Sequence, residues 1–204
     1  MTILILYENE TFYFHRINGK GFKEGTYKGM DITFGKPGLA RAYLVRAIKC
    51  VESGEIVEGP CLVVQTILKI MTPTITKVKD FHQLYTNKNP KLSIHDVASE
   101  LFMRPKEAWQ INLSCSPRVG LKYKSIKGYT DETVLKYCMG PYRFIVDTVK
   151  IKKQQSTIKM ARDKTSYLSA REAGSKITID QLPYGLASWK VADIARCYGC
   201  YESL

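Results

Sequence analysis

The chain has 204 residues, of which 45% are hydrophobic and 25% charged. This mix is typical of a folded protein that buries a core without disulfides or metal ions, and it excludes disorder over the whole chain. The formal net charge is +12, and such basic chains favour polyanionic partners. We find neither an apolar run of about 20 residues nor a secretory signal, so we expect a cytoplasmic protein without a membrane partner.

The first 73 residues predict strands followed by one helix. Apolar and aromatic residues predict strands over 2–7, 10–17 and 30–34, and the apolar run at 40–48 predicts a buried strand. Glu58-Gly59-Pro60 predicts a helix start, because proline fits the first turn. The apolar face of this helix, which ends before Pro73, consists of Leu62, Val63, Thr66, Ile67 and Ile70.

After Pro73 the pattern is more mixed. Residues 72–92 are polar and predict a long surface loop, whereas Ser93 and Asp96 resemble a capping box and predict a short helix ending near Met103. The later elements are predicted as strands over 107–114 and 118–123 joined through 114–117, a helix over 131–138 that ends at Gly140-Pro141, a strand over 142–151 and a short helix over 186–194. The chain is therefore predicted to be α+β, with a core over 1–151 and a basic extension over 152–204.

Positive charge is concentrated between Arg118 and Lys164, where twelve basic and four acidic residues give a net charge of +8. Tyrosines at 123, 129, 137 and 142 lie among them. Lysine and arginine bind phosphates, and tyrosine can stack on unpaired bases, so this pattern predicts RNA binding. A solvated lysine-rich face is the alternative. The predicted RNA-binding residues are Arg118, Lys122, Lys124, Lys127, Arg143, Lys150, Lys152, Lys153, Lys159, Arg162, Lys164 and Arg171.

The cysteines and histidines indicate little chemistry. Cys197 and Cys200 have the spacing of a zinc or redox pair, but the chain has no second such pair. A helix end capped by Gly199 is the simpler interpretation, so we expect no cofactor, with zinc as the alternative. The other cysteines, at 50, 61, 115 and 138, are predicted to be buried free thiols. The three histidines, His15, His82 and His95, have no catalytic spacing.

Several stretches resemble the alkyladenine (3-methyladenine) DNA glycosylase family. They are Tyr43-Leu44-Val45-Arg46-Ala47-Ile48, Glu58-Gly59-Pro60, Ser116-Pro117-Arg118-Val119-Gly120 and Gly140-Pro141-Tyr142-Arg143-Phe144-Ile145-Val146. The resemblance implies a single glycosylase-like α+β domain built on a curved, mostly antiparallel sheet. The family also needs a catalytic glutamate and a tyrosine that wedges into the duplex, and neither has a matching residue here. We therefore expect a scaffold without enzymatic activity.

A second resemblance concerns function. The block GTYKGMDITFG at residues 25–35, the core and the basic tail ending in Cys197-Tyr198-Gly199-Cys200 look like the dormancy factors found on microsporidian ribosomes. This resemblance implies a hibernation factor that inhibits translation by occupying the tRNA exit site, with rRNA and ribosomal proteins as partners and no small-molecule substrate. The alternatives are an alkyladenine-type glycosylase acting on damaged purines, with Glu24 or Asp31 as its base, and a basic protein whose core binds another protein.

Overall fold

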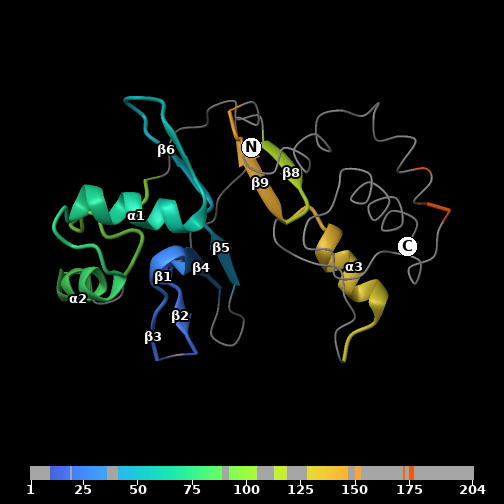
Figure 1. The fold of residues 1–204 in the computed structure, drawn as a ribbon, viewed down its shortest axis with the longest axis horizontal. Helices are drawn as coiled ribbons and strands as arrows, with labels where there is room; N and C mark the ends of the chain where they lie inside the picture. Colours follow the sequence, from blue (N-terminus) through green and yellow to red (C-terminus); the bar gives the residue numbers. More distant parts are fainter. Residues whose placement is uncertain are drawn as a thin grey trace. The chain divides into compact units, whose positions relative to one another are not determined.

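The computed structural model describes residues 10–18, 20–35, 41–88, 92–104, 113–118, 128–146, 150–152, 172 and 175–176. The chain divides into two compact units, Met1–Glu107 and Ala108–Leu204, so the predicted core over 1–151 spans both. Each unit combines helix with strands, and every described strand pair is antiparallel (Figure 1). The predicted α+β class is therefore confirmed.

A three-stranded sheet organises the first unit. It consists of β1 (Thr11–Phe14), β4 (Met30–Phe34) and β5 (Arg41–Leu44) in the order β1-β4-β5. Side chains alternate across its faces, so Phe12, Phe14 and Met30 are buried on one side. Residues 92–94 extend the other edge of β1, through the bonds from Phe12 N to Leu92 O (2.9 Å) and from Ile94 N to Glu10 O (3.1 Å).

Two small hairpins accompany the sheet. One pairs β2 (Arg16–Ile17) with β3 (Gly21–Phe22), and a 3₁₀ turn, η1 (Gly25–Tyr27), follows it. The other pairs β6 (Ala47–Lys49) with β7 (Ile56–Glu58). The predicted buried strand over 40–48 is wrong, because β5 ends at Leu44 and β6 begins at Ala47. Both strands lie largely exposed.

Helix α1 (Pro60–Met71) begins where the sequence predicts. Gly59 precedes it with a φ of 114°, a backbone conformation that favours glycine. The helix ends at Thr72, whose N–H and hydroxyl both donate to the Leu68 carbonyl, at 2.8 and 3.1 Å. Its buried face was predicted only in part, since Val63 is buried and Ile67 packs against the core as predicted. Val63, Val64 and Leu68 are buried, whereas Leu62 and Ile70 are exposed.

Helix α2 (Val78–Lys88) replaces most of the predicted loop over 72–92, so that prediction is wrong. The helix buries Val78, Phe81 and Tyr85, three apolar residues at helical spacing in an otherwise polar segment. Its start is stabilised from far along the chain, because a carboxylate oxygen of Glu24 accepts the N–H groups of Val78 and Lys79 at 2.8 and 3.3 Å. The sequence shows no local N-terminal capping pattern at the start of this helix.

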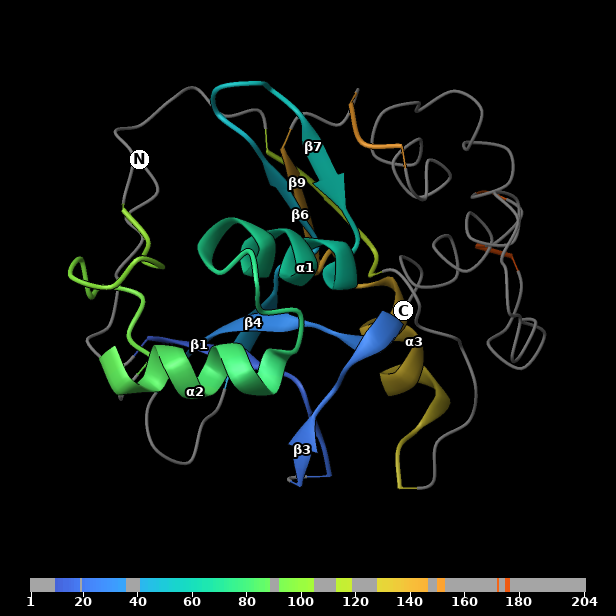
Figure 2. The same cartoon turned by 60° about the vertical axis from the view of Figure 1, so that its left-hand side comes forward.

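Both helices contribute to the core on the Phe12 and Phe14 face of the sheet (Figure 2). The Phe81 ring meets Phe14 edge-on at 5.6 Å between centroids and stacks on Tyr85 at 5.4 Å. The Tyr85 hydroxyl is satisfied by Ser99 Oγ at 2.7 Å and by the Leu101 carbonyl. This cluster fixes α2 and the segment around Ser99 to the sheet.

Residues 92–104 form turns rather than the predicted helix. The Ser93 hydroxyl accepts the His95 N–H at 3.3 Å, and Asp96 accepts the Ala98 N–H at 3.1 Å. Both side chains therefore bond only two residues ahead, which closes turns instead of starting a helix. The Met103 N–H donates to the Ile94 carbonyl at 2.7 Å and closes the segment on itself.

The second unit contains α3 (Asp131–Met139) and the strand pair β8 (Leu113–Ser116) with β9 (Arg143–Val146). The α3 prediction is confirmed, with Thr130 Oγ1 accepting the Thr133 N–H at 3.2 Å as its cap. β8 overlaps the end of the predicted strand over 107–114 and most of the predicted join over 114–117, and its partner β9 lies within the predicted strand over 142–151. Residues 107–112 and 119–123 of the predicted strands lie outside the described residues, as does the predicted helix over 186–194.

The three described α-helices are short. They have 12, 11 and 9 residues, against the about 20 that a membrane span needs. Within the described part of the chain, no helix is both long and apolar enough to cross a bilayer.

Candidate nucleic-acid interface

Four of the twelve predicted RNA-binding residues lie in the described part of the second unit. Arg118, Lys150 and Lys152 are exposed, and Arg143 is half-buried on β9. The other predicted positions lie outside the described residues: Lys122, Lys124, Lys127, Lys153, Lys159, Arg162, Lys164 and Arg171, together with Cys197 and Cys200.

Exposed rings accompany these charges. Tyr129, Tyr137, Tyr142 and Phe144 are 59%, 61%, 54% and 52% exposed, so each presents more than half of its surface to solvent. We call these four residues the aromatic set. Solubility alone does not require these rings, since a lysine-rich surface serves that purpose without them.

The local folding explains why these rings point outward. Helix α3 buries Val134 and Leu135, which leaves Tyr137 on its opposite side. On β9 the alternation of a strand buries Ile145 and therefore exposes Phe144.

The Tyr142 ring lies over Gly140 at the end of α3. A Cβ on Gly140 would collide with that ring and with the Lys136 carbonyl oxygen. Gly140 therefore leaves room for the Tyr142 ring, and it also marks the end of α3, as the sequence predicts.

The two carboxylates considered as catalytic bases both have structural partners. Glu24 accepts the first N–H groups of α2, as described above. Asp31 Oδ1 lies 2.9 Å from Nε2 of His15, across β1 and β4. The His15 ring lies so close to Gly29 that a Cβ there would collide with its Nδ1 atom. The Nε2 atom of His15 therefore contacts Asp31, and its Nδ1 atom lies against Gly29. These positions favour a structural contact between the two strands over proton transfer.

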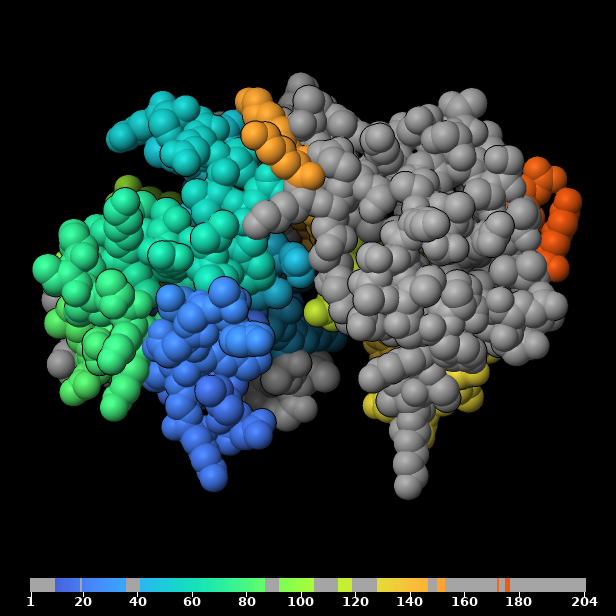
Figure 3. Space-filling model, in the orientation of Figure 1, coloured from blue at the N-terminus to red at the C-terminus, as the bar shows by residue number. Residues whose placement is uncertain are grey.

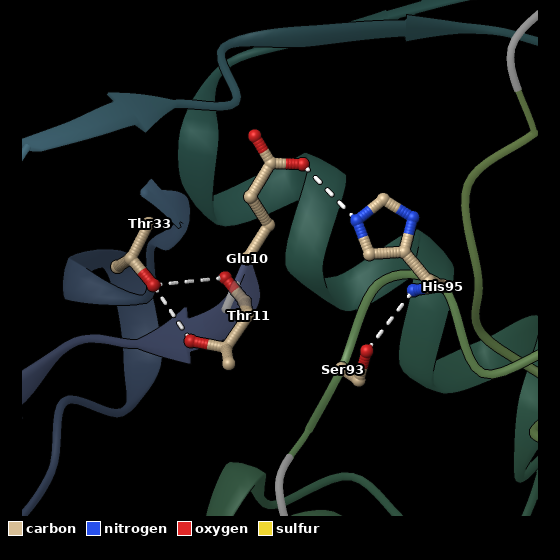
Figure 4. A network of polar contacts seen from close by, with 5 residues as sticks. All are labelled: Glu10, Thr11, Thr33, Ser93 and His95. Atoms are coloured by element: carbon tan, nitrogen blue, oxygen red, sulfur yellow. Dashed lines mark hydrogen bonds and ion pairs between the residues drawn. The ribbon is translucent and has the colours of Figure 1, made fainter. Parts of the chain in front are cut away.

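A second acid–histidine pair, Glu10 with His95, was missed in the sequence. Glu10 is only 6% exposed, and its Oε2 lies 3.2 Å from Nε2 of His95, a contact that becomes an ion pair when His95 is protonated (Figure 4). Beside it, the hydroxyls of Thr11 and Thr33 lie 2.6 Å apart and join β1 to β4. The pair fastens the turn at His95 to the sheet edge. Sequence reasoning could not find it, because its members are distant in the chain and neither belongs to a motif.

His82 belongs to a layered contact on α2. The Arg16 guanidinium lies 4.7 Å from the centre of the Phe22 ring, and the Phe22 and His82 rings lie 4.6 Å apart. Burial lowers the pKa of His82, and the positive charge of Arg16 lowers it further. The folded protein therefore holds His82 in its neutral form at neutral pH.

We expect His82 to make the fold acid-sensitive. Its folded pKa lies below its unfolded value, so the unfolded chain binds more protons, and stability falls as the pH drops below about 6.5. In His82→Phe, which keeps a ring against Phe22, the free energy of unfolding should decline less between pH 7 and pH 5 than in the natural chain. Urea titrations across this range measure the difference, and parallel curves would contradict it.

The cysteines differ from the prediction of buried thiols. Cys138 is buried, which raises the pKa of its thiol, whereas Cys50 and Cys115 are exposed and Cys61 is half-buried. The Ser53 hydroxyl and the backbone N–H groups of Ser53 and Glu52 lower the pKa of the Cys50 thiol. Cys61 donates its Sγ hydrogen to the Gly25 carbonyl at 3.1 Å. None of these four forms a disulfide, and within the described ranges no group of three or more His, Cys, Asp and Glu could hold a metal ion.

A small hollow lies between α2 and its neighbours in the first unit. It is lined by Met71, Thr72, Phe81, Leu84, Tyr85 and Glu100. It encloses about 10 Å³, room for about one water molecule, so it cannot hold a nucleobase.

Comparison with known proteins gives one relative. The chain is 28% identical over 165 residues to uncharacterized protein L759 of Acanthamoeba polyphaga mimivirus, covering 74% of this chain and 69% of that protein. No family model and no solved structure matches the chain. The resemblances to glycosylases and dormancy factors therefore remain predictions from sequence motifs.

Proposed function

We propose that the protein binds RNA without catalysing a reaction, and that it acts in the cytoplasm as a dormancy factor in the tRNA exit site of idle ribosomes. The observation that carries the proposal is the aromatic set, four rings more than half exposed between residues 129 and 144. They lie in the stretch 118–164, whose net charge is +8. Exposed rings and a net positive charge together suit single-stranded or looped RNA.

Aromatic side chains and basic side chains contribute differently to such an interface. Each ring that stacks on an unpaired base contributes about 1–3 kcal/mol, with little dependence on sequence. Each lysine or arginine that meets a phosphate releases counterions and makes binding salt-dependent. In the second unit Lys136 has a different role, because it pairs with Glu132 at 2.6 Å on the exposed side of α3.

The choice of ribosomal RNA rests on two supports. Ribosomal RNA is a polyanion with exposed loops whose bases are free to stack. The block at 25–35 and the basic tail resemble dormancy factors of microsporidian ribosomes. The mechanism would be steric, since a folded protein in the exit site excludes a deacylated tRNA.

The absence of catalysis is supported by the positions of the acids. Glu24 and Asp31 serve a helix start and a cross-strand pair, and the described hollow is too small for a base. Release of free hypoxanthine from a duplex oligonucleotide by the purified protein would overturn this part of the proposal.

Co-sedimentation with purified ribosomes through a sucrose gradient at moderate salt tests the main claim. We expect the protein to travel with the ribosomal particles and to return to the top of the gradient after ribonuclease digestion. A protein that stays at the top without digestion would contradict the proposal. One that stays bound to ribosomal proteins after digestion would show that it recognises protein instead of RNA.

Charge reversal at Lys150, Lys152 and Lys153 should weaken this binding about ten-fold. It should also reduce the slope of log affinity against log salt by about 0.7 for each lost contact with single-stranded RNA. Fluorescence anisotropy with a labelled 20-nucleotide RNA measures both quantities. The control reverses exposed charges in the first unit, in Lys69→Glu/Arg104→Glu, which should bind within about two-fold of the natural chain. Equal affinities for natural chain and variant would contradict the assignment.

A further inference from the structure

We propose that the first unit carries a second RNA contact, formed by residues 16–28. This segment, which we call the basic hairpin, comprises the β2–β3 hairpin and η1. The inference rests on the proposed function, because it assigns the same partner to a second surface. None of the RNA-binding residues predicted from the sequence lies in the basic hairpin, which is outside the stretch 118–164.

The basic hairpin carries a net positive charge. It contains four basic residues, Arg16, Lys20, Lys23 and Lys28, and one acid, Glu24. The Glu24 carboxylate is committed to the N–H groups at the start of α2. Among the residues that the structure describes, none of the four basic side chains has a carboxylate within ion-pair distance. The segment therefore carries a net charge of +3, with Arg16 and Lys20 exposed and Lys23 and Lys28 half-buried.

The basic hairpin is also held rigidly. The turn is closed by the bond from Lys20 N to Ile17 O (2.8 Å), and Lys23 N donates to His15 O (2.8 Å). Phe22 lies between the Arg16 guanidinium and the His82 ring, which ties the hairpin to α2. In Figure 3 the hairpin, at the blue end of the chain, projects from its surroundings. A preorganised projection loses little conformational freedom on binding.

A ring accompanies the charges. Tyr27 is 78% exposed, the most exposed tyrosine among the described residues, and Lys28 follows it directly. The turn that carries Tyr27 is fixed at both sides, through Glu24 to α2 and through the Gly25 carbonyl to Cys61 on α1. Positive charge beside a rigid exposed ring repeats the chemistry of the aromatic set, and it fits phosphates next to an unpaired base.

The test compares two double variants with the same net charge. Lys20→Glu/Lys28→Glu should bind the labelled 20-nucleotide RNA about ten-fold more weakly, with a salt slope smaller by about 1.4, the value for two contacts at about 0.7 each. Lys69→Glu/Arg104→Glu, with both changes in the first unit but outside the hairpin, should remain within about two-fold of the natural chain. Lys20→Gln/Lys28→Gln should lie between them. Circular dichroism confirms that each variant is folded.

The outcomes separate this inference from the proposed function. If the hairpin variant binds like the natural chain while reversal at Lys150, Lys152 and Lys153 weakens binding, the inference is wrong and the proposed function stands. Equal losses in hairpin and control variants would show a general charge effect and overturn the inference. If the natural chain binds no RNA, both fail. Binding to anionic lipid vesicles but not to RNA would also overturn both.

Discussion

Replacing Phe81 with alanine is expected to lower the free energy of unfolding by about 3–5 kcal/mol, as is typical for deletion of a buried aromatic ring. Phe81 is 1% exposed and lies at the centre of the core of the first unit. Its ring contacts Phe14 of the sheet on one side and Tyr85 of its own helix on the other. The substitution removes both contacts and leaves a cavity that the surrounding rings can fill only in part.

Leu84 provides a matched control on the same helix. It is 43% exposed, so Leu84→Ala deletes apolar atoms without opening a comparable cavity and should cost less than about 1 kcal/mol. Urea denaturation followed by circular dichroism measures both values. Similar losses for the two variants would mean that α2 does not pack against the sheet as described.

The elements with local signals were predictable from the sequence. The strand over 30–34 has an apolar pattern of its own, α1 has Gly59 and Pro60 at its start, and α3 has Thr130 before it and Gly140 after it. In each case the residues that determine the element lie inside it or next to it. Such signals act before any tertiary contact exists, so sequence reasoning can detect them.

The elements that were predicted incorrectly depend on residues that are distant in the chain. Helix α2 is capped by Glu24 and packs against Phe14. Both residues lie more than 50 positions before the start of the helix, so no local sequence pattern connects them with it. The segment at 93–103 has the sequence of a helix start but pairs with β1 instead. In both cases a tertiary contact overrides the local preference, and no reading of the segment alone can detect it.

Some features of the candidate interface could be predicted from the sequence and others could not. Basic residues and tyrosines are visible in the sequence, so the stretch 118–164 could be identified. Exposure of the rings could not, because it depends on which side of α3 and β9 is buried. The basic hairpin was missed for a further reason. Its basic residues are spread over 13 positions, and only the fold shows that they share one hairpin and turn with the exposed Tyr27 ring.

Glu24 is the residue on which the enzymatic and non-enzymatic hypotheses differ most sharply. We expect Glu24→Ala to lower the free energy of unfolding by about 2 kcal/mol, because two N–H groups at the start of α2 lose a charged acceptor. Glu24→Gln keeps an acceptor oxygen in the same place and should lose less than about half as much. Glu52→Ala, which removes an exposed acid from the turn between β6 and β7, should change stability by less than about 0.5 kcal/mol.

The same variants separate structure from catalysis. A general base loses its function when its carboxylate becomes an amide, whereas a helix cap largely keeps it. If Glu24 were the base of a glycosylase, Glu24→Gln would abolish release of hypoxanthine from a duplex while leaving the fold intact. We expect no release from the natural chain or from either variant, and a loss of stability that follows the number of acceptors remaining at the start of α2. That result would support the proposal that Glu24 holds the start of α2 in place and takes no part in a reaction.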